Sequence, residues 1–162
     1  MRAPLTTLQA TIGVLLMVVA SSCSLGGPST VSLNSASVDP SYTCPAGADN
    51  TPYEVHATID LRNGTTSSVT ITSVAASMTV AAVKGSWLER VGDKFEASGV
   101  TFAPATVGPG KSTSLKVTIP STCTNGPAPT ASYGEYSVGL VVAASSGTYT
   151  IASQNRHRIL AG

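Results

Sequence analysis

The sequence predicts an all-β domain, a sandwich or a barrel, on three observations. Short stretches of alternating apolar and polar residues recur from about residue 31 onward, and turn-forming residues separate them. Only 10% of the 162 residues are charged, and Ser, Thr, Ala, Val and Gly take their place. Alternation with a period of two puts every second side chain on one face of a strand. About seven to nine such stretches are the pattern of an antiparallel sandwich or barrel.

The first half of this domain carries the clearest alternation. A first strand begins at Val31 and ends near Asp39. The next, Tyr53–Leu61, alternates without interruption, which predicts that its odd-numbered residues point inward. Residues 62–65 contain Asn-Gly, a pair that tolerates positive φ, so we expect a hairpin turn there. Alternation resumes over 69–72 and 74–83.

The second half repeats the pattern. Leu115–Ile119 alternates, and Pro120 is expected to end that strand because it lacks a backbone donor. Residues 136–142 form another strand, and the turn at 145–147 leads into a strand over 149–151. We expect 156–160 to be a last edge strand.

One segment departs from the alternation. Ser86 and Glu89 have capping-box spacing, and Trp87, Leu88, Val91 and Phe95 recur at helical intervals. The sequence therefore predicts a single helical turn there, crossing between the sheets.

The N-terminus predicts export. Arg2 is followed by an apolar run of about ten residues, which is too short for a bilayer span and is typical of a secretory signal peptide. The run ends in small residues directly before Cys23, and this passage resembles the lipobox of bacterial lipoproteins. Ala20 stands where that family most often has Leu. The resemblance implies a signal peptide over 1–22 and a diacylglycerol on the Cys23 thiol.

The three cysteines fit this interpretation. If Cys23 carries lipid, Cys44 and Cys123 remain as a pair in an oxidising compartment, where a disulfide persists. Both lie beside Pro-rich segments, so we expect a bridge that pins two irregular loops at one end of the domain, with the two Cα atoms about 4.4–6.8 Å apart. Residues 23–30 are small and include Gly and Pro, which predicts a flexible tether before a domain over 31–162.

A second resemblance concerns the fold. Phe102–Ser112, with its Pro109-Gly110 pair, is followed by an alternating strand and is similar to a passage of bacterial surface Ig-like domains. In such domains the Pro-Gly turn carries the chain from one sheet to the other. The resemblance implies an Ig-like antiparallel β-sandwich and brings no catalytic residues with it.

Charge and motifs exclude several function classes. The formal net charge is +1, and removal of residues 1–22 leaves eight basic and eight acidic residues, which argues against nucleic acid as a partner. A polybasic membrane patch is also missing from the sequence. Gly110-Lys111-Ser112 resembles the end of a phosphate-binding loop, but Ala105 stands where that motif needs Gly. The sequence contains no Gly-x-Ser-x-Gly motif. We therefore expect a non-enzymatic protein without a cofactor.

Two functional hypotheses remain. The favoured one is a lipid-anchored envelope protein on the extracytoplasmic face of the cell membrane, a binding, adhesion or structural module whose ligand is an envelope protein or polysaccharide. In it, the charged loop beside Trp87 is either a binding loop with an aromatic anchor or a solvated loop flanking a core tryptophan. The alternative is a small copper- or zinc-handling lipoprotein that uses His56 and His157 as surface ligands, with Glu54 and Asp60 on the same strand face as His56.

Overall fold

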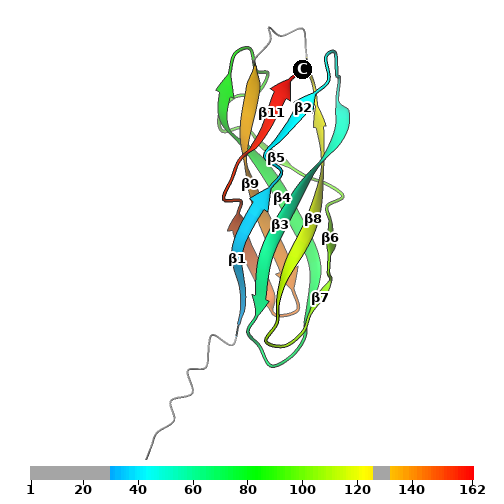
Figure 1. The fold of residues 1–162 in the computed structure, drawn as a ribbon, viewed down its shortest axis with the longest axis vertical. Coiled ribbons are helices and arrows are strands. Elements are labelled where there is room, and N and C mark those ends of the chain that lie inside the picture. The colour runs from blue at the N-terminus through cyan, green and yellow to red at the C-terminus, as the bar shows by residue number, and fades with distance from the viewer. Residues whose placement is uncertain (1–29, 126–131) are drawn as a thin grey trace, which may run out of the picture.

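The chain folds into two facing β-sheets, as Figure 1 shows for the computed structural model, which describes residues 30–125 and 132–162. The first sheet has four strands in the order β1 (Val31–Val38), β3 (Thr51–Asn63), β8 (Ser112–Cys123) and β6 (Thr101–Ala103). The second sheet has the order β2 (Ser41–Cys44), β11 (His157–Ala161), β9 (Tyr133–Ala144), β4 (Val69–Lys84) and β5 (Lys94–Glu96). Two further strands join this second sheet: β10 (Gly147–Ala152) pairs with β9, and β7 (Thr106–Val107) pairs with β4. The prediction of an all-β, Ig-like sandwich is confirmed.

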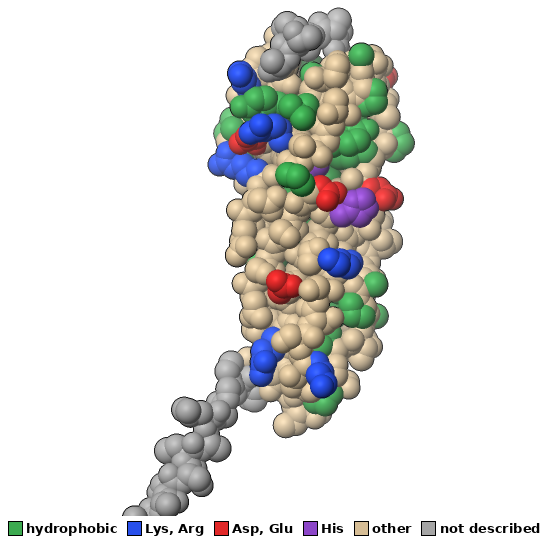
Figure 2. All heavy atoms as spheres, in the orientation of Figure 1, with side chains coloured by type: hydrophobic (Ala, Val, Ile, Leu, Met, Phe, Trp, Pro, Cys, Tyr) green, Lys and Arg blue, Asp and Glu red, His purple; other side chains and the backbone are tan. Residues whose placement is uncertain are grey.

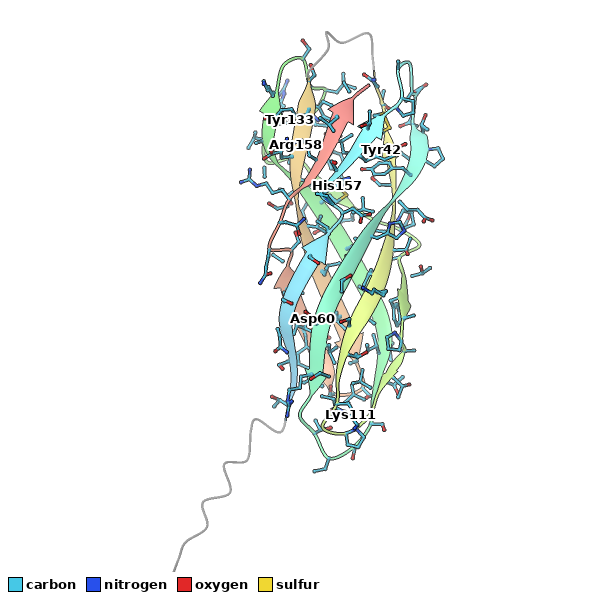
Figure 3. The ribbon with its side chains drawn as sticks, in the orientation of Figure 1. Tyr42, Asp60, Lys111, Tyr133, His157 and Arg158 are labelled. Carbon is cyan, nitrogen blue, oxygen red and sulfur yellow. A yellow bond between two sulfur atoms is a disulfide. The ribbon has the colours of Figure 1, made fainter. Side chains whose placement is uncertain are left out.

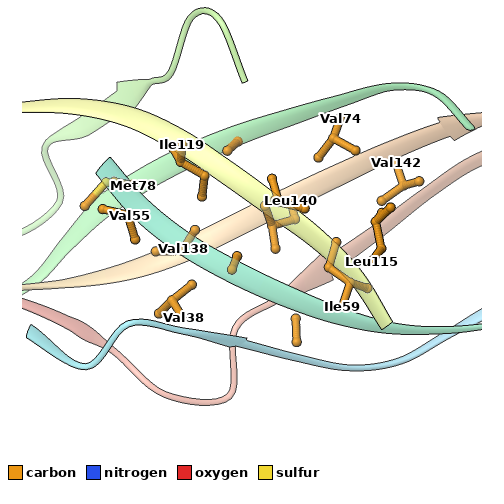
Figure 4. Packing of buried hydrophobic residues seen from close by; sticks show 14 of the residues in the cluster. Val38, Val55, Ile59, Val74, Met78, Leu115, Ile119, Val138, Leu140 and Val142 are labelled. Carbon is orange, nitrogen blue, oxygen red and sulfur yellow. The ribbon is translucent and has the colours of Figure 1, made fainter. Parts of the chain in front are cut away.

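The core lies between the two sheets, where branched aliphatic side chains of both inner faces interdigitate (Figure 4). Val55 and Ile59 of β3 and Leu115 of β8 face Leu140 and Val142 of β9, and all five are fully buried. The predicted alternation of Tyr53–Leu61 is confirmed, because buried and outward residues alternate along the whole of β3. Alternation thus correctly identified the inner face of the central strands.

β4 is longer than predicted. The two stretches 69–72 and 74–83 form one strand of 16 residues, and its pairing with β9 shifts register twice. A register shift lets a strand bend without ending, since one extra residue is accommodated on one side of the ladder.

The Asn63-Gly64 turn differs from the prediction. β3 and β4 belong to different sheets, so the connection crosses the sandwich instead of closing a hairpin. Neither residue has a positive φ. The Asn63 side chain is buried, and its Nδ2 donates to the carbonyls of Ser67, Val107 and Gly108 at 2.8, 3.0 and 3.1 Å. Asn63 therefore fastens its own loop to the end of β7 at this end of the domain.

The Pro109-Gly110 turn has the predicted role. It joins β7, which pairs with β4, to β8, which pairs with β3, so the chain changes sheets there. Gly110 has a φ of 67°, a conformation that favours glycine. The expectation of a turn at Gly110-Lys111, followed by a strand, is confirmed.

Two strand predictions need correction. β8 continues through Pro120 to Cys123, because Pro120 lies beyond the last residue that β6 pairs and a missing amide there leaves no bond to β6 unmade. β11 is also no edge strand. It lies between β9, which it pairs antiparallel, and β2, which it pairs in parallel.

The two edges of the sandwich are closed differently. On one edge Asn155 accepts from the amide of Val38 at 3.0 Å and donates to its carbonyl at 2.8 Å, which ties the β10–β11 connection to β1. On the other edge β7 covers only the start of β4. The stretch of β8 beyond β6 therefore faces β5 and the chain before it with no strand between them.

A disulfide joins the two sheets. Cys44 ends β2 and Cys123 ends β8, and their Cα atoms are 6.0 Å apart. The pairing and its separation are as predicted, but the loop-pinning role is wrong. Both cysteines are buried at strand ends, so the bridge holds one sheet against the other.

The surface is weakly charged. On the face shown in Figure 2, charged side chains stand singly or in small groups among uncharged residues. Within the described ranges, no helix has the length and apolar character needed to cross a membrane. The predicted signal peptide, Cys23 and nearly all of the predicted tether lie outside the described residues.

Candidate functional site

A cleft of about 620 Å³ opens between the sheets along the incompletely closed edge. Its walls are the end of β8 from Pro120 to Cys123 on one side, and β5 with the connection over 85–93 on the other. Trp87 of that connection and Tyr136 of β9 line the space between. We call this space the Trp87 cleft.

Trp87 packs directly against β9 because Gly134 of that strand has no side chain. A Cβ atom at Gly134 would stand 2.4 Å from Trp87 Nε1 and 2.7 Å from Cε2, so the indole lies directly on the glycine backbone. Its Nε1–H donates to Glu89 Oε2 at 2.9 Å and lies 3.1 Å from the Tyr136 hydroxyl. The indole is therefore fixed in position and orientation while half-buried.

Glu89 accepts two neutral donors on one carboxylate oxygen. Both the Trp87 indole N–H and the Tyr136 hydroxyl reach Oε2. Burial, and next to it the Glu89 carboxylate, raises the pKa of Tyr136, so the phenol remains protonated and donates. The second oxygen, Oε1, receives no hydrogen bond from the residues that the structure describes, nor does Glu89 form an ion pair with any of them.

These bonds explain why the predicted helical turn does not form. A capping box requires Glu89 to accept from the Ser86 amide. That amide instead donates to Ser132 Oγ at 3.1 Å, and the Glu89 carboxylate is engaged by Trp87 and Tyr136. Gly85 and Gly92 have φ values of 68° and 98°, which a right-handed helix does not contain. The segment consists of turns followed by β5.

The rim of the Trp87 cleft is apolar and exposed. Leu88 is 69% exposed and Phe95 44% exposed, and both line the cleft. Val91, 62% exposed, belongs to the same connection. Trp87 combines features of both readings: it is half-buried and packs against the hydrophobic core, and its ring also borders a cleft with exposed apolar neighbours.

The charged side chains that line the cleft are acidic. They are Glu89 and Glu96, and among the residues that the structure describes no Lys, Arg or His side chain joins them. Glu96 is already paired, since Lys94 Nζ lies 2.6 Å from its Oε1. Glu89 is therefore the carboxylate of the cleft without a basic partner in the described part of the chain.

His56 is a surface residue held between acidic groups. Its Nδ1–H donates to Asp39 Oδ2 at 2.9 Å, and its Nε2 lies 3.6 Å from Glu54 Oε2. Asp60, which the sequence placed on the same face, accepts instead from the hydroxyls of Ser35 and Ser114.

His157 is buried on β11, and the prediction of two surface histidines is wrong for it. Its ring stacks on Tyr53, which in turn stacks on Tyr42 of β2, and Figure 3 shows Tyr42 and His157 on these neighbouring strands. Nδ1–H donates to the Asp39 carbonyl at 2.8 Å, and Nε2 has no hydrogen-bond partner among the described residues. Burial lowers the pKa of His157.

The histidines thus do not form the predicted metal site. Both contact Asp39, His56 at the carboxylate and His157 at the main-chain carbonyl, but the His157 ring is enclosed by its aromatic neighbours. No group of three or more His, Cys, Asp or Glu side chains within residues 30–125 and 132–162 is arranged to hold a metal ion.

Sequence reasoning missed Tyr136 and Gly134 as parts of the cleft. Tyr136 was expected only as a strand residue, and its hydroxyl reaches Glu89 across 47 positions of the chain. The sequence carried one signal for this partnership: Glu89 lies two residues after the single tryptophan, inside a segment rich in charge.

No protein-family model and no curated protein matches the chain. Among solved structures, the chain is similar to the ASH/PapD-like domain 7 of human CEP192, with 16% identity over 98% of both chains and a TM-score of 0.34. It is also similar to AggA, the major subunit of aggregative adherence fimbriae type I from Escherichia coli, with 8% identity, 82% and 95% coverage and a TM-score of 0.40. The CooA pilin subunit from enterotoxigenic Escherichia coli shows 8% identity, 80% and 99% coverage and a TM-score of 0.30. At these values the likeness carries nothing about function.

Proposed function

We propose that this chain is a non-enzymatic, lipid-anchored module of the cell envelope that binds a ligand in the Trp87 cleft. The observation that carries the proposal is the cleft itself, in which an indole fixed by Gly134, Glu89 and Tyr136 borders open space beside exposed Leu88. A concave site with apolar walls and a few convergent polar groups is the usual form of a ligand site. The ligand belongs to an envelope protein or polysaccharide on the extracytoplasmic face.

The anchoring part of the proposal is supported by the cysteine arrangement. The bridge between Cys44 and Cys123 accounts for two of the three cysteines and leaves Cys23, which follows the lipobox-like residues. A single thiol there is what lipid attachment requires.

The position of the cleft suits a protein anchored near residue 23. Val31, where the domain begins, pairs with Asn63 at one end of β3, whereas the cleft wall near Cys123 pairs with Thr51 at the other end. Along β3, twelve residues at about 3.3 Å each separate these ends by about 40 Å. Figure 1 shows β1 beginning at the lower end and β2 with β11 lying at the upper end. Such a chain would hold its cleft away from the membrane.

Two measurements on the full-length chain in a bacterial cell test the proposal separately. For the anchor, metabolic palmitate labelling is expected in the parent chain and lost in Cys23→Ala; label that persists in the variant refutes the anchor. For the cleft, a photo-crosslinking amino acid at position 88 is expected to form an adduct, whereas the same group at Val141, exposed on β9, is not. Adducts of equal yield at both positions would refute a specific site.

The adduct also distinguishes the two ligand sources. A protease-sensitive adduct identifies an envelope protein, and a protease-resistant one identifies a polysaccharide. Gly134→Ala, which pushes the indole off β9, should abolish either adduct.

A further inference from the structure

We propose that the Trp87 cleft takes an organic cation, a primary amine or guanidinium carried on an apolar body. The inference rests on the proposed function, since it names the chemistry of the ligand in the same cleft. The charges, the aromatic rings and the hydrogen bonds of the lining residues carry it.

The charge of the cleft favours a cation. Its charged lining side chains are both carboxylates, and one of them, Glu96, is neutralised by Lys94 at 2.6 Å. Glu89 is not neutralised by any described residue, and two neutral donors hold one of its oxygens in place. Its other oxygen is available to an incoming donor. A preorganised carboxylate with an open oxygen binds an ammonium or guanidinium group through charge-assisted hydrogen bonds.

The aromatic rings favour the same ligand. Trp87, which is half-buried, and Phe95, which is 44% exposed, line the cleft, and the face of an aromatic ring attracts a cation within about 6 Å of its centroid. Tryptophan is the more effective of these two rings in this role. Tyr136 is buried, and it contributes its hydroxyl to Glu89 instead of a ring face. The exposed side chains of Leu88 and Phe95 offer the surface against which an apolar body would pack.

Other ligand charges fit less well. An anion would be brought beside the unpaired carboxylate of Glu89. A neutral sugar could stack on Trp87, but the indole N–H and the Tyr136 hydroxyl that would orient it are already committed to Glu89. A cation needs an acceptor and a ring face, and the Glu89 Oε1 atom and the ring of Trp87 supply these.

The single tryptophan makes the test direct. Trp87 is the only tryptophan of the chain, so its fluorescence reports on the cleft alone. Purified full-length protein in detergent is titrated with phenethylamine (cationic), 2-phenylethanol (neutral) and 3-phenylpropionate (anionic), which share an apolar body. We expect phenethylamine to change the Trp87 fluorescence in a saturable manner. 2-Phenylethanol should bind at least about tenfold more weakly, and 3-phenylpropionate should not reach saturation.

Matched variants locate the charge. Glu89→Gln keeps an oxygen that accepts from Trp87 and Tyr136 but removes the negative charge, and we expect phenethylamine to bind at least about tenfold more weakly. Glu96→Gln, the control, removes a carboxylate already paired with Lys94 and should change affinity by less than about threefold. The emission maximum of each ligand-free variant verifies that the indole stays in place.

Three results would overturn the inference: no saturable response to phenethylamine up to about 10 mM, equal affinity for 2-phenylethanol, or unchanged affinity in Glu89→Gln. The last two leave the cleft as a binding site and refute only the cationic ligand. If the chain that carries the photo-crosslinking group at position 88 forms no adduct in cells, by contrast, the proposed function itself is refuted.

Discussion

Gly134→Ala tests whether the Trp87 indole lies on β9 as described. The added Cβ would stand 2.4 Å from Nε1 and 2.7 Å from Cε2 of Trp87, and 3.0 Å from the Tyr136 hydroxyl. Non-bonded carbon atoms in proteins approach to about 3.5–4.0 Å, so the indole must move by about 1 Å or swing out of the cleft. A methyl group is enough to force this because backbone, and not a flexible side chain, carries it.

The cost can be worked from the contacts that are lost. The indole N–H donates to Glu89 at 2.9 Å and lies 3.1 Å from the Tyr136 hydroxyl, and a hydrogen bond contributes about 1 kcal/mol. Overpacking adds about 1–3 kcal/mol, and Ala returns about 0.5–1 kcal/mol over Gly in a strand. We expect the variant to be about 1–3 kcal/mol less stable.

The assay is urea unfolding followed both by tryptophan fluorescence and by circular dichroism. The variant should unfold at lower urea, and its native emission should shift to the red because the indole becomes more hydrated. Gly139→Ala, on the same strand, is the control: its Cβ would meet only the rotatable Ser77 hydroxyl, at 3.2 Å. A Gly134→Ala variant with parental emission and parental midpoint would refute the described position of the indole.

Three other perturbations test the framework. Reduction of the Cys44–Cys123 bridge, which spans 79 positions, should lower the free energy of unfolding by about 4–5 kcal/mol while leaving the β circular dichroism spectrum, and an unchanged midpoint would contradict this. Asn63→Asp places a carboxylate against three carbonyl oxygens in a buried site and should cost about 3 kcal/mol or more in urea unfolding; a loss below about 1 kcal/mol would contradict the triple hydrogen bond. The pKa of His157 is lowered by burial from its ordinary 6.5, so the unfolded chain binds the proton more tightly, and the free energy of unfolding should decrease as the pH falls below about 6.5, by up to about 1.4 kcal/mol per pH unit. His157→Gln should flatten that pH dependence; a slope equal to that of the parent protein would contradict the assignment.

The sequence predicts the inner faces of the sandwich well, because burial imposes a period of two on any strand covered on one side. Tyr53–Leu61 illustrates this, since its alternation survives intact in β3. The disulfide pairing follows from counting, because setting aside Cys23, which resembles a lipobox cysteine, leaves a single pair. Such features depend on local pattern or on parity, and both are visible in the sequence.

The failures share a physical cause, which is that tertiary contacts override local preference. Ser86 and Glu89 have the spacing of a helix cap, but Ser132, Trp87 and Tyr136 take up their hydrogen bonds from elsewhere. The sequence predicts Asn63 as a turn residue, but its side chain is a buried donor to Val107 and Gly108, which only the fold brings near it. Local spacing does not report which distant strand supplies a competing partner.

The position of β11 has the same origin. The predicted strand over 156–160 is short and contains two arginines, a pattern typical of an edge strand. β11 lies between β2 and β9 because β2 pairs with it in parallel. The alternation of residues along a strand does not predict which other strand will pair with it. The sequence therefore predicts only part of the candidate cleft. It identifies Trp87 and its acidic neighbours, but it does not identify the residues of β9 against which Trp87 packs.

The indole ¹H–¹⁵N resonance of Trp87 tests the central claim most directly, that this cleft is a binding site with the Glu89 carboxylate at its centre. The chain has one tryptophan, so the spectrum contains one such resonance, and its proton is the one donated to Glu89 Oε2 at 2.9 Å. We predict that phenethylamine shifts the resonance in a saturable manner. The affinity obtained from this titration should be at least about tenfold lower in Glu89→Gln. A resonance that stays in place throughout the titration of the parent protein would contradict the claim.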